Sequence, residues 1–381
     1  MSTQRQKQDA AIAVFRELGW EGAGLDQVMG LPLGTEQQRR GAREGLEKGE
    51  WEGFLPDPAD AEESGEWGNF WGVDSSVLRF FALRVGVSPR RAAAVMAEHS
   101  RGWAHPKATK ATVAALAERG TEFAARFVDA AASGNEFAWF EVSDAALAAV
   151  HELRLPVPGQ TQYLDSYAEY VALLLARVAE GSAPDPNAPW QPELESIRAR
   201  FAEHVAQGVP AAAARSEDWA AVVSGAAALG WLSRAEALEL AWTGLDAAQR
   251  PVARGPWVSA LAGPLAVSDD ELDAARDRLI PLLSLGHGPL VELVAPRLLA
   301  RSSDEQAVEL AYAALSAGTQ KAKVAVLKAL AARPAPQGEA RAELLGVVEP
   351  FLDGTPTEAK AAAALLAAWG AEAPGDETGP I

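Results

Sequence analysis

Three short stretches decide the fold of this chain: SRAE at 233–236, SDDE at 268–271 and SDEQ at 303–306. Each begins with serine and carries Glu or Gln three residues later, which is the capping-box pattern of a helix start. The three serines lie 35 residues apart. A helical unit of that length cannot bury its apolar face alone, so the spacing predicts helix pairs that stack into an array.

The array is predicted to occupy residues 191–370, and its period fits two known repeat types. Tetratricopeptide units are about 34 residues long and HEAT units about 40. The Trp, Leu-Gly and Tyr positions of the tetratricopeptide pattern are missing, so the sequence favours an all-α, HEAT-like α-solenoid. First helices are expected to begin at Ser233, Ser268, Ser303 and near Gly338, and second helices near Pro256, Gly288, Thr319 and Thr357. The predicted buried positions are Leu238, Ala241, Trp242, Leu272, Ala275, Leu279, Leu310, Leu315, Leu327, Leu330, Leu345 and Val348.

Residues 1–182 are predicted to form an irregular N-terminal helical region. The stretch 50–74 has prolines, glycines and large aromatic residues without helical periodicity, which indicates a long loop. Ser143 is expected to cap a later helix of this region. The segment 181–192 contains four prolines and is the predicted boundary, and residues 371–381 are predicted to be a disordered tail.

Composition excludes several classes of protein. Of 381 residues, 49% are hydrophobic, and apolar residues recur at helical spacing, which predicts an all-α core. The chain has no cysteine, so it has no disulfide framework and no thiolate chemistry. No apolar run reaches the roughly 20 residues of a membrane span, so we expect a cytoplasmic protein that needs neither a membrane nor a cofactor.

The net charge of −18 favours a basic protein partner and disfavours nucleic acid. The charge is unevenly distributed, because residues 50–66 are acidic and residues 79–110 are basic. The basic block, with nearby tryptophans, could bind an anion or an acidic protein; alternatively, the acidic loop covers it. The candidate binding residues are Arg84, Arg90, Arg91, Arg101, Trp103, Lys107, Trp67 and Trp71.

Two motifs suggest metal chemistry. Asp269, Asp270 and Asp273 form a DDxxD string, which resembles the magnesium site of terpenoid synthases. The alternative is an acidic first turn favoured by the helix dipole, and the second metal motif of such enzymes is missing. His151-Glu152 begins like the zinc motif HExxH, but Leu155 replaces the second histidine. We therefore expect no catalytic residue and no metal site.

The segments LAERGTEFAARFV (116–128), AKVAVLKALAARP (322–334) and residues 232–272 resemble a family of uncharacterised actinobacterial helical-repeat proteins. The resemblance implies a HEAT-like fold and supplies no catalytic residue. The sequence thus predicts a non-catalytic protein-binding scaffold or adaptor. Two alternatives remain: a nucleic-acid-binding HEAT-like protein of the DNA-lesion glycosylase type, using residues 79–110, and a terpenoid-synthase-like enzyme using Asp269 to Asp273.

Overall fold

The computed structural model describes residues 3–49, 73–97, 106–183, 188, 190–211, 216–316 and 318–371. Every regular element in these ranges is a helix, so the predicted all-α class is confirmed. Of the predicted loop, only Val73 and Asp74 are described, and they begin a helix; of the predicted tail, only Ala371 is described.

The chain divides into two compact units, Met1–Ala211 and Ala212–Ile381, which we call unit 1 and unit 2. The sequence placed the boundary earlier, in the proline-rich segment at 181–192. The two positions differ because the helix that follows this segment, α10 (Leu194–Ala211), packs on α8 and α9 of unit 1. Among the described residues, none of the helices combines the length and the apolar character needed to cross a bilayer.

Helical elements fill the described part of unit 1. They are α1 (Gln4–Glu17), α2 (Glu36–Leu46), α4 (Val73–Val85), α5 (Pro89–Ala97), α6 (Pro106–Arg119), α7 (Thr121–Ala132), α8 (Glu136–Glu152), α9 (Thr161–Glu180) and α10. The first two helices pack closely at Gly45, where an added Cβ would lie 2.2 Å from the Lys7 carbonyl oxygen. Glycine is therefore required at this contact.

From α4 onward, alternate helices of unit 1 contact one another. Helix α6 packs on α4 and α8, and α7 packs on α5 and α9. This regularity differs from the irregular region predicted from sequence. The prediction missed α6 entirely, and it placed the start of α8 at Ser143. The cap lies eight residues earlier, at Asn135, whose side chain accepts a hydrogen bond from the Ala138 N–H.

Helices also fill the described part of unit 2. They are α11 (Ser216–Ala228), α12 (Arg234–Ala247), α13 (Pro251–Ala262), α14 (Asp269–Ala274), α15 (Arg276–Leu283), α16 (Gly288–Leu299), α17 (Asp304–Ser316), α18 (Gln320–Ala331), α19 (Gly338–Val348) and α20 (Pro356–Ala368), with a short 3-10 turn at Glu349–Phe351. The capping boxes at Ser233, Ser268 and Ser303 all form.

Three details of the predicted helix pairs need correction. Helix α13 begins at Pro251, which takes the first helical position, and Pro256 lies inside it. The helix that starts after Ser268 is interrupted at Ala275 and continues as α15. A fourth capping box is present, but it belongs to α20, where Thr355 pairs with Glu358.

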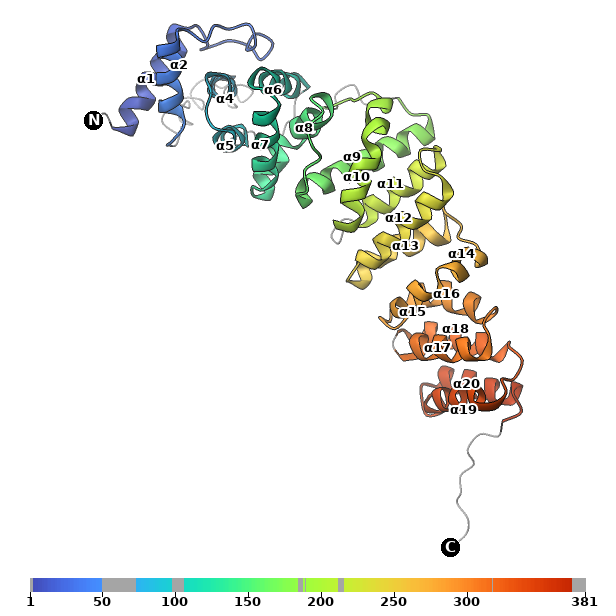
Figure 1. Cartoon of the computed structure of the whole chain (residues 1–381). Helices are drawn as coiled ribbons and strands as arrows, with labels where there is room; N and C mark the ends of the chain where they lie inside the picture. The colour runs from blue at the N-terminus through green and yellow to red at the C-terminus, as the bar shows by residue number, and fades with distance from the viewer. Residues whose placement is uncertain are drawn as a thin grey trace, which may run out of the picture. The chain divides into compact units, whose positions relative to one another are not determined.

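The helices at the C-terminal end of unit 2 form two rows (Figure 1). Helix α18 contacts α16 and α20, while α17 contacts α15 and α19. Ten of the twelve predicted core positions are buried, and Ala275 and Leu345 are half-buried. In α19 the buried leucine is Leu344, so the predicted position was wrong by one residue.

Arginine side chains link helices that are separated by about one repeat. Arg234 bonds to Glu271 at 2.6 Å, and Arg278 bonds to Asp246 at 2.5 Å. We call these contacts the arginine bridges. The arginines in these ion pairs are not available to bind an acidic ligand.

Candidate functional site

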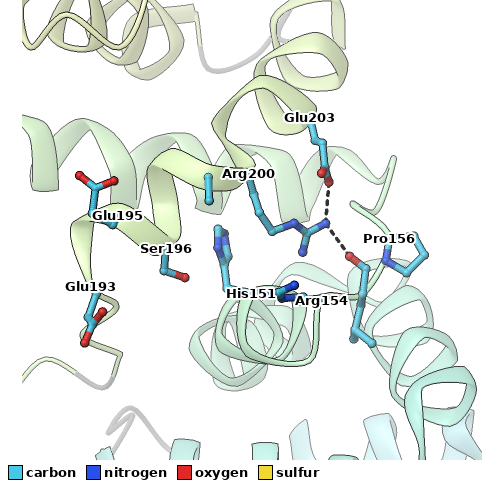
Figure 2. A pocket seen from close by; sticks show the side chains of 10 residues that line it. His151, Arg154, Pro156, Glu193, Glu195, Ser196, Arg200 and Glu203 are labelled. Carbon is cyan, nitrogen blue, oxygen red and sulfur yellow. Dashed lines mark hydrogen bonds and ion pairs between the residues drawn. The ribbon is translucent and has the colours of Figure 1, made fainter.

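The candidate site is a cavity of about 740 Å³ in unit 1, between the end of α8 and the start of α10 (Figure 2). A volume of this size accommodates a small molecule or a short peptide. Its wall combines apolar and charged side chains. The lining residues are His151, Arg154, Leu155, Pro156, Glu193, Glu195, Ser196, Ala199, Arg200 and Glu203.

One side of the cavity is the C-terminal end of α8. The chain leaves this helix through Arg154, whose φ of +50° lies in the left-handed region. The Leu155 N–H bonds to the Val150 carbonyl at 3.1 Å, which is the six-to-one bond of a Schellman ending. The ends of α1, α9 and α11 place Gly19, Gly181 and Gly230 in this conformation. An arginine in the left-handed region is strained relative to glycine.

Arg200 of α10 holds this helix end in place. Its guanidinium donates to the carbonyl oxygens of Val150 and Leu155, the latter at 2.7 Å, and pairs with Glu203 at 2.7 Å (Figure 2). The Arg200 side chain is only 13% exposed. Arg200 therefore adds a second donor to the Val150 carbonyl at the end of α8 and supplies a donor to the Leu155 carbonyl that follows this helix.

Behind the cavity lies a stack of aromatic rings. The His204 ring is stacked on Tyr167, with centroids 3.9 Å apart, and on His151, with centroids 5.0 Å apart. Trp190 meets His151 at a tilt, with centroids 5.1 Å apart. His204 Nδ1 lies 2.9 Å from the Arg200 carbonyl oxygen, and Nε2 lies 3.0 Å from the Tyr163 hydroxyl. The carbonyl can only accept, so Nδ1 carries the proton and Nε2 accepts from Tyr163.

His151 differs from His204 in its partners. Its side chain is 4% exposed, and neither ring nitrogen has a hydrogen-bond partner of normal geometry among the described residues. Burial, followed by the nearby His204 and Arg200, lowers the pKa of His151 to about 3, against weaker opposing effects of the Ser196 backbone and Glu203. Burial also lowers the pKa of His204 to about 4. Both rings are therefore neutral at pH 7.

The structure separates the residues predicted to form a basic binding block. Arg84 was predicted to bind a partner, and this requires correction. Its side chain is 7% exposed, bonds to Glu118 at 2.7 Å, and donates to the carbonyl oxygens of Val28 and Leu31. Because α4 packs closely beside α6, the Arg84 side chain lies in the interior, where its contacts stabilise unit 1.

Of the other predicted binding residues, three lie in the described part of the chain and four do not. Arg91 donates to the carbonyl oxygens of Leu46 and Gly49, whereas Arg90 and Lys107 are exposed. Four candidates lie outside the described residues, as does the acidic stretch proposed to cover them. These four are Arg101, Trp103, Trp67 and Trp71.

The sequence did not predict the cavity at the end of α8. His151 was considered only as part of a zinc motif. Two signals could have indicated the site: an arginine where this chain elsewhere uses glycine after a helix, and Tyr163 and Tyr167 four residues apart on one helix face. The contact of both tyrosines with His204 crosses helices and is not visible in any local pattern.

The DDxxD string is bonded within the fold. Asp269 pairs with Arg297, Asp270 with Arg301 and Asp273 with Arg276, each at 2.5 Å. Among the described residues, no group of three or more His, Asp or Glu side chains is arranged to hold a metal ion. The three aspartates are thus engaged as ends of ion pairs.

Adding magnesium is expected to leave the melting temperature of the protein unchanged. A bound ion would stabilise the folded state, but here it would first have to break the arginine pairs of Asp269 and Asp270. Thermal unfolding at increasing magnesium concentration measures this. A rise in melting temperature that is absent in Asp269→Asn would contradict the expectation.

Comparison with known proteins adds no functional assignment: no family model matches the chain, and no similar sequence is found among curated proteins nor any similar fold among solved structures.

Proposed function

We propose that this protein is a HEAT-like helical-repeat scaffold that binds a basic segment of another protein through unit 2. The observation that carries the proposal is the repetition of the same contacts along the chain. Alternate helices pack on one another, and arginine bridges join helices about one repeat apart. Repeat arrays of this kind present extended surfaces that suit partner chains.

The binding surface we propose is a cavity of about 420 Å³ beside α12, α14 and α15. Leu238 and Trp242 contribute its apolar wall, and each is 6% exposed. Glu239 is occupied by Arg278 at 2.9 Å, but Asp277 has no ion pair with any described residue. An apolar wall with an available carboxylate fits a segment that combines an apolar side chain and a basic one.

A capture experiment with matched charge variants tests this proposal. The full chain is immobilised, partner proteins are captured from a lysate of the source cells, and they are identified by mass spectrometry. Asp277→Arg reverses the charge at the cavity, whereas Glu309→Arg makes the same change at an exposed site on α17. We expect a partner to be retained by the wild type and by Glu309→Arg, and to be lost with Asp277→Arg. Equal retention by all three proteins would contradict the proposed surface.

The nucleic-acid and terpenoid-synthase alternatives receive no supporting observation. Of the basic block, Arg84 and Arg91 bond within unit 1 and are not free to contact phosphates. The aspartates of the DDxxD string are paired with arginines.

A further inference from the structure

We infer that the cavity between α8 and α10 binds a small zwitterion, with a carboxylate group at Arg154 and an ammonium group at Glu193. A short peptide with both ends unblocked has this chemistry. The site lies in unit 1 and is independent of the scaffold surface proposed for unit 2.

The charges in the cavity define this ligand. Glu203 is paired with Arg200 at 2.7 Å, and Glu195 is near Arg198 at 3.6 Å. Arg154 is different, because its guanidinium has no hydrogen bond or ion pair with any residue that the structure describes. The Glu193 carboxylate likewise has no partner in the described parts of the chain. The cavity thus presents one available cation and one available anion.

These two available charges do not neutralise each other. Arg154 comes from the end of α8 and Glu193 from the segment before α10, and Figure 2 shows them on different sides of His151 and Ser196. A ligand that carried only an anion would meet the carboxylates of Glu193 and its neighbours, and a ligand that carried only a cation would meet Arg154. A molecule with both charges avoids each repulsion and gains two charge-assisted contacts.

His151 supports a ligand in this place. It is a cavity-lining side chain more than nine-tenths buried, and neither of its ring nitrogens has a hydrogen-bond partner of normal geometry among the described residues. Unpartnered buried polar atoms are uncommon and unfavourable. A peptide N–H or C=O group can supply the missing partner, and a neutral ring repels neither end of the ligand.

The backbone at Arg154 gives a second reason to assign it a role. Glycine would occupy its left-handed conformation without strain, as it does at the ends of α1, α9 and α11. Strained residues tend to occur where their side chains serve binding. The side chain of Arg154, which is exposed at the cavity, is therefore expected to contact the ligand.

Calorimetric titration of the full chain with trialanine tests the inference. Two control ligands of nearly equal size each lack one charge: N-acetyl-trialanine has no ammonium group, and trialanine amide has no carboxylate. We expect trialanine to bind at least about tenfold more tightly than either control, as the loss of a charge-assisted contact predicts. Binding of a blocked peptide as tight as that of trialanine, or no binding of trialanine, would overturn the inference.

Variants separate binding from folding. Arg154→Gly should raise the melting temperature by about 2 to 4 °C, because it relieves backbone strain, while trialanine binding falls at least about tenfold. The matched control is Ala266→Gly in unit 2, at the other non-glycine residue with positive φ in the part of the chain that the structure describes. It should also raise the melting temperature but leave trialanine binding unchanged. Glu193→Gln should weaken binding of trialanine and of trialanine amide, because both ligands carry the ammonium group. Binding of trialanine amide at the wild-type level in Glu193→Gln would refute the assignment of Glu193.

The two proposals can fail separately. Capture of a protein partner depends on Asp277 in unit 2, whereas trialanine binding depends on Arg154 and Glu193 in unit 1. If a variant at Asp277 loses partner capture, its trialanine binding shows whether the protein is still folded. If a variant at Arg154 or Glu193 loses trialanine binding, its partner capture shows the same.

Discussion

Unit 1 is expected to lose about 4 kcal/mol of folding free energy between pH 7 and pH 5, because His151 and His204 remain neutral in the folded state. Their folded pKa values are about 3 and about 4, below the ordinary value of 6.5. In the unfolded chain both rings take up protons as the pH falls through 6.5. Each therefore favours unfolding by about 2 kcal/mol at pH 5, and the stabilisation present above pH 6.5 is lost progressively toward the folded pKa values.

Chemical denaturation followed by circular dichroism at pH 7, 6 and 5 measures this loss. In the double variant His151→Phe with His204→Gln, the rings that take up protons on unfolding are gone. Its stability should therefore change little over the same pH range, although its stability at pH 7 is lower than that of the wild type. An equal pH dependence in the wild type and the double variant would show that other groups cause the loss.

The second large effect is expected at Trp257 in unit 2. Its indole is completely buried, and it packs against Gly244 so closely that an added Cβ would lie 2.2 Å from the ring. Trp257→Ala should destabilise the protein by about 3 to 5 kcal/mol, since it removes a large core side chain and leaves a cavity. Gly244→Ala should cost about 1 to 3 kcal/mol, because the buried ring has little room to move.

A double-mutant cycle separates these two effects. If the clash with the ring causes the loss in Gly244→Ala, combining it with Trp257→Leu should cost less than the sum of the single variants. Gly255→Ala on α13 is the control, because an added Cβ there meets no atom within 4 Å. It should leave stability unchanged or raise it by up to about 1 kcal/mol. Additive losses in the cycle would contradict a direct contact between the two positions.

The fold class and three of the helix starts were predictable because they depend on local chemistry. A capping box involves residues three apart, so Ser233, Ser268 and Ser303 indicated three helix starts that the structure confirms. Helix α6 was missed because a threonine- and alanine-rich segment gives little contrast between its faces. The interruption at Ala275 follows from no residue in the sequence that we can identify.

The candidate site was not predictable, because its parts come together only through packing between helices. Arg200 reaches carbonyl oxygens about 50 residues earlier in the chain, and His204 meets Tyr163 across 41 residues. The same limit explains the error at Arg84. A count of basic residues places it on a charged surface, whereas its contacts with Val28 and Glu118 make it part of the interior.

The arginine bridges and the contacts of Trp369 at the end of α20 determine the order in which the helices of unit 2 unfold locally. At the C-terminal end, the Trp369 indole N–H donates to the Arg333 carbonyl at 3.3 Å, and Arg341 donates to the Trp369 carbonyl at 2.8 Å. Arg341 thus joins the two helices of the last pair, and the Trp369 indole joins that pair to the end of α18. Detaching α19 and α20 therefore leaves the bridge between Arg234 and Glu271 intact. Amide hydrogen exchange in unit 2 would then be graded, fastest in the last helix pair and slower toward α16, because fraying exposes one pair at a time.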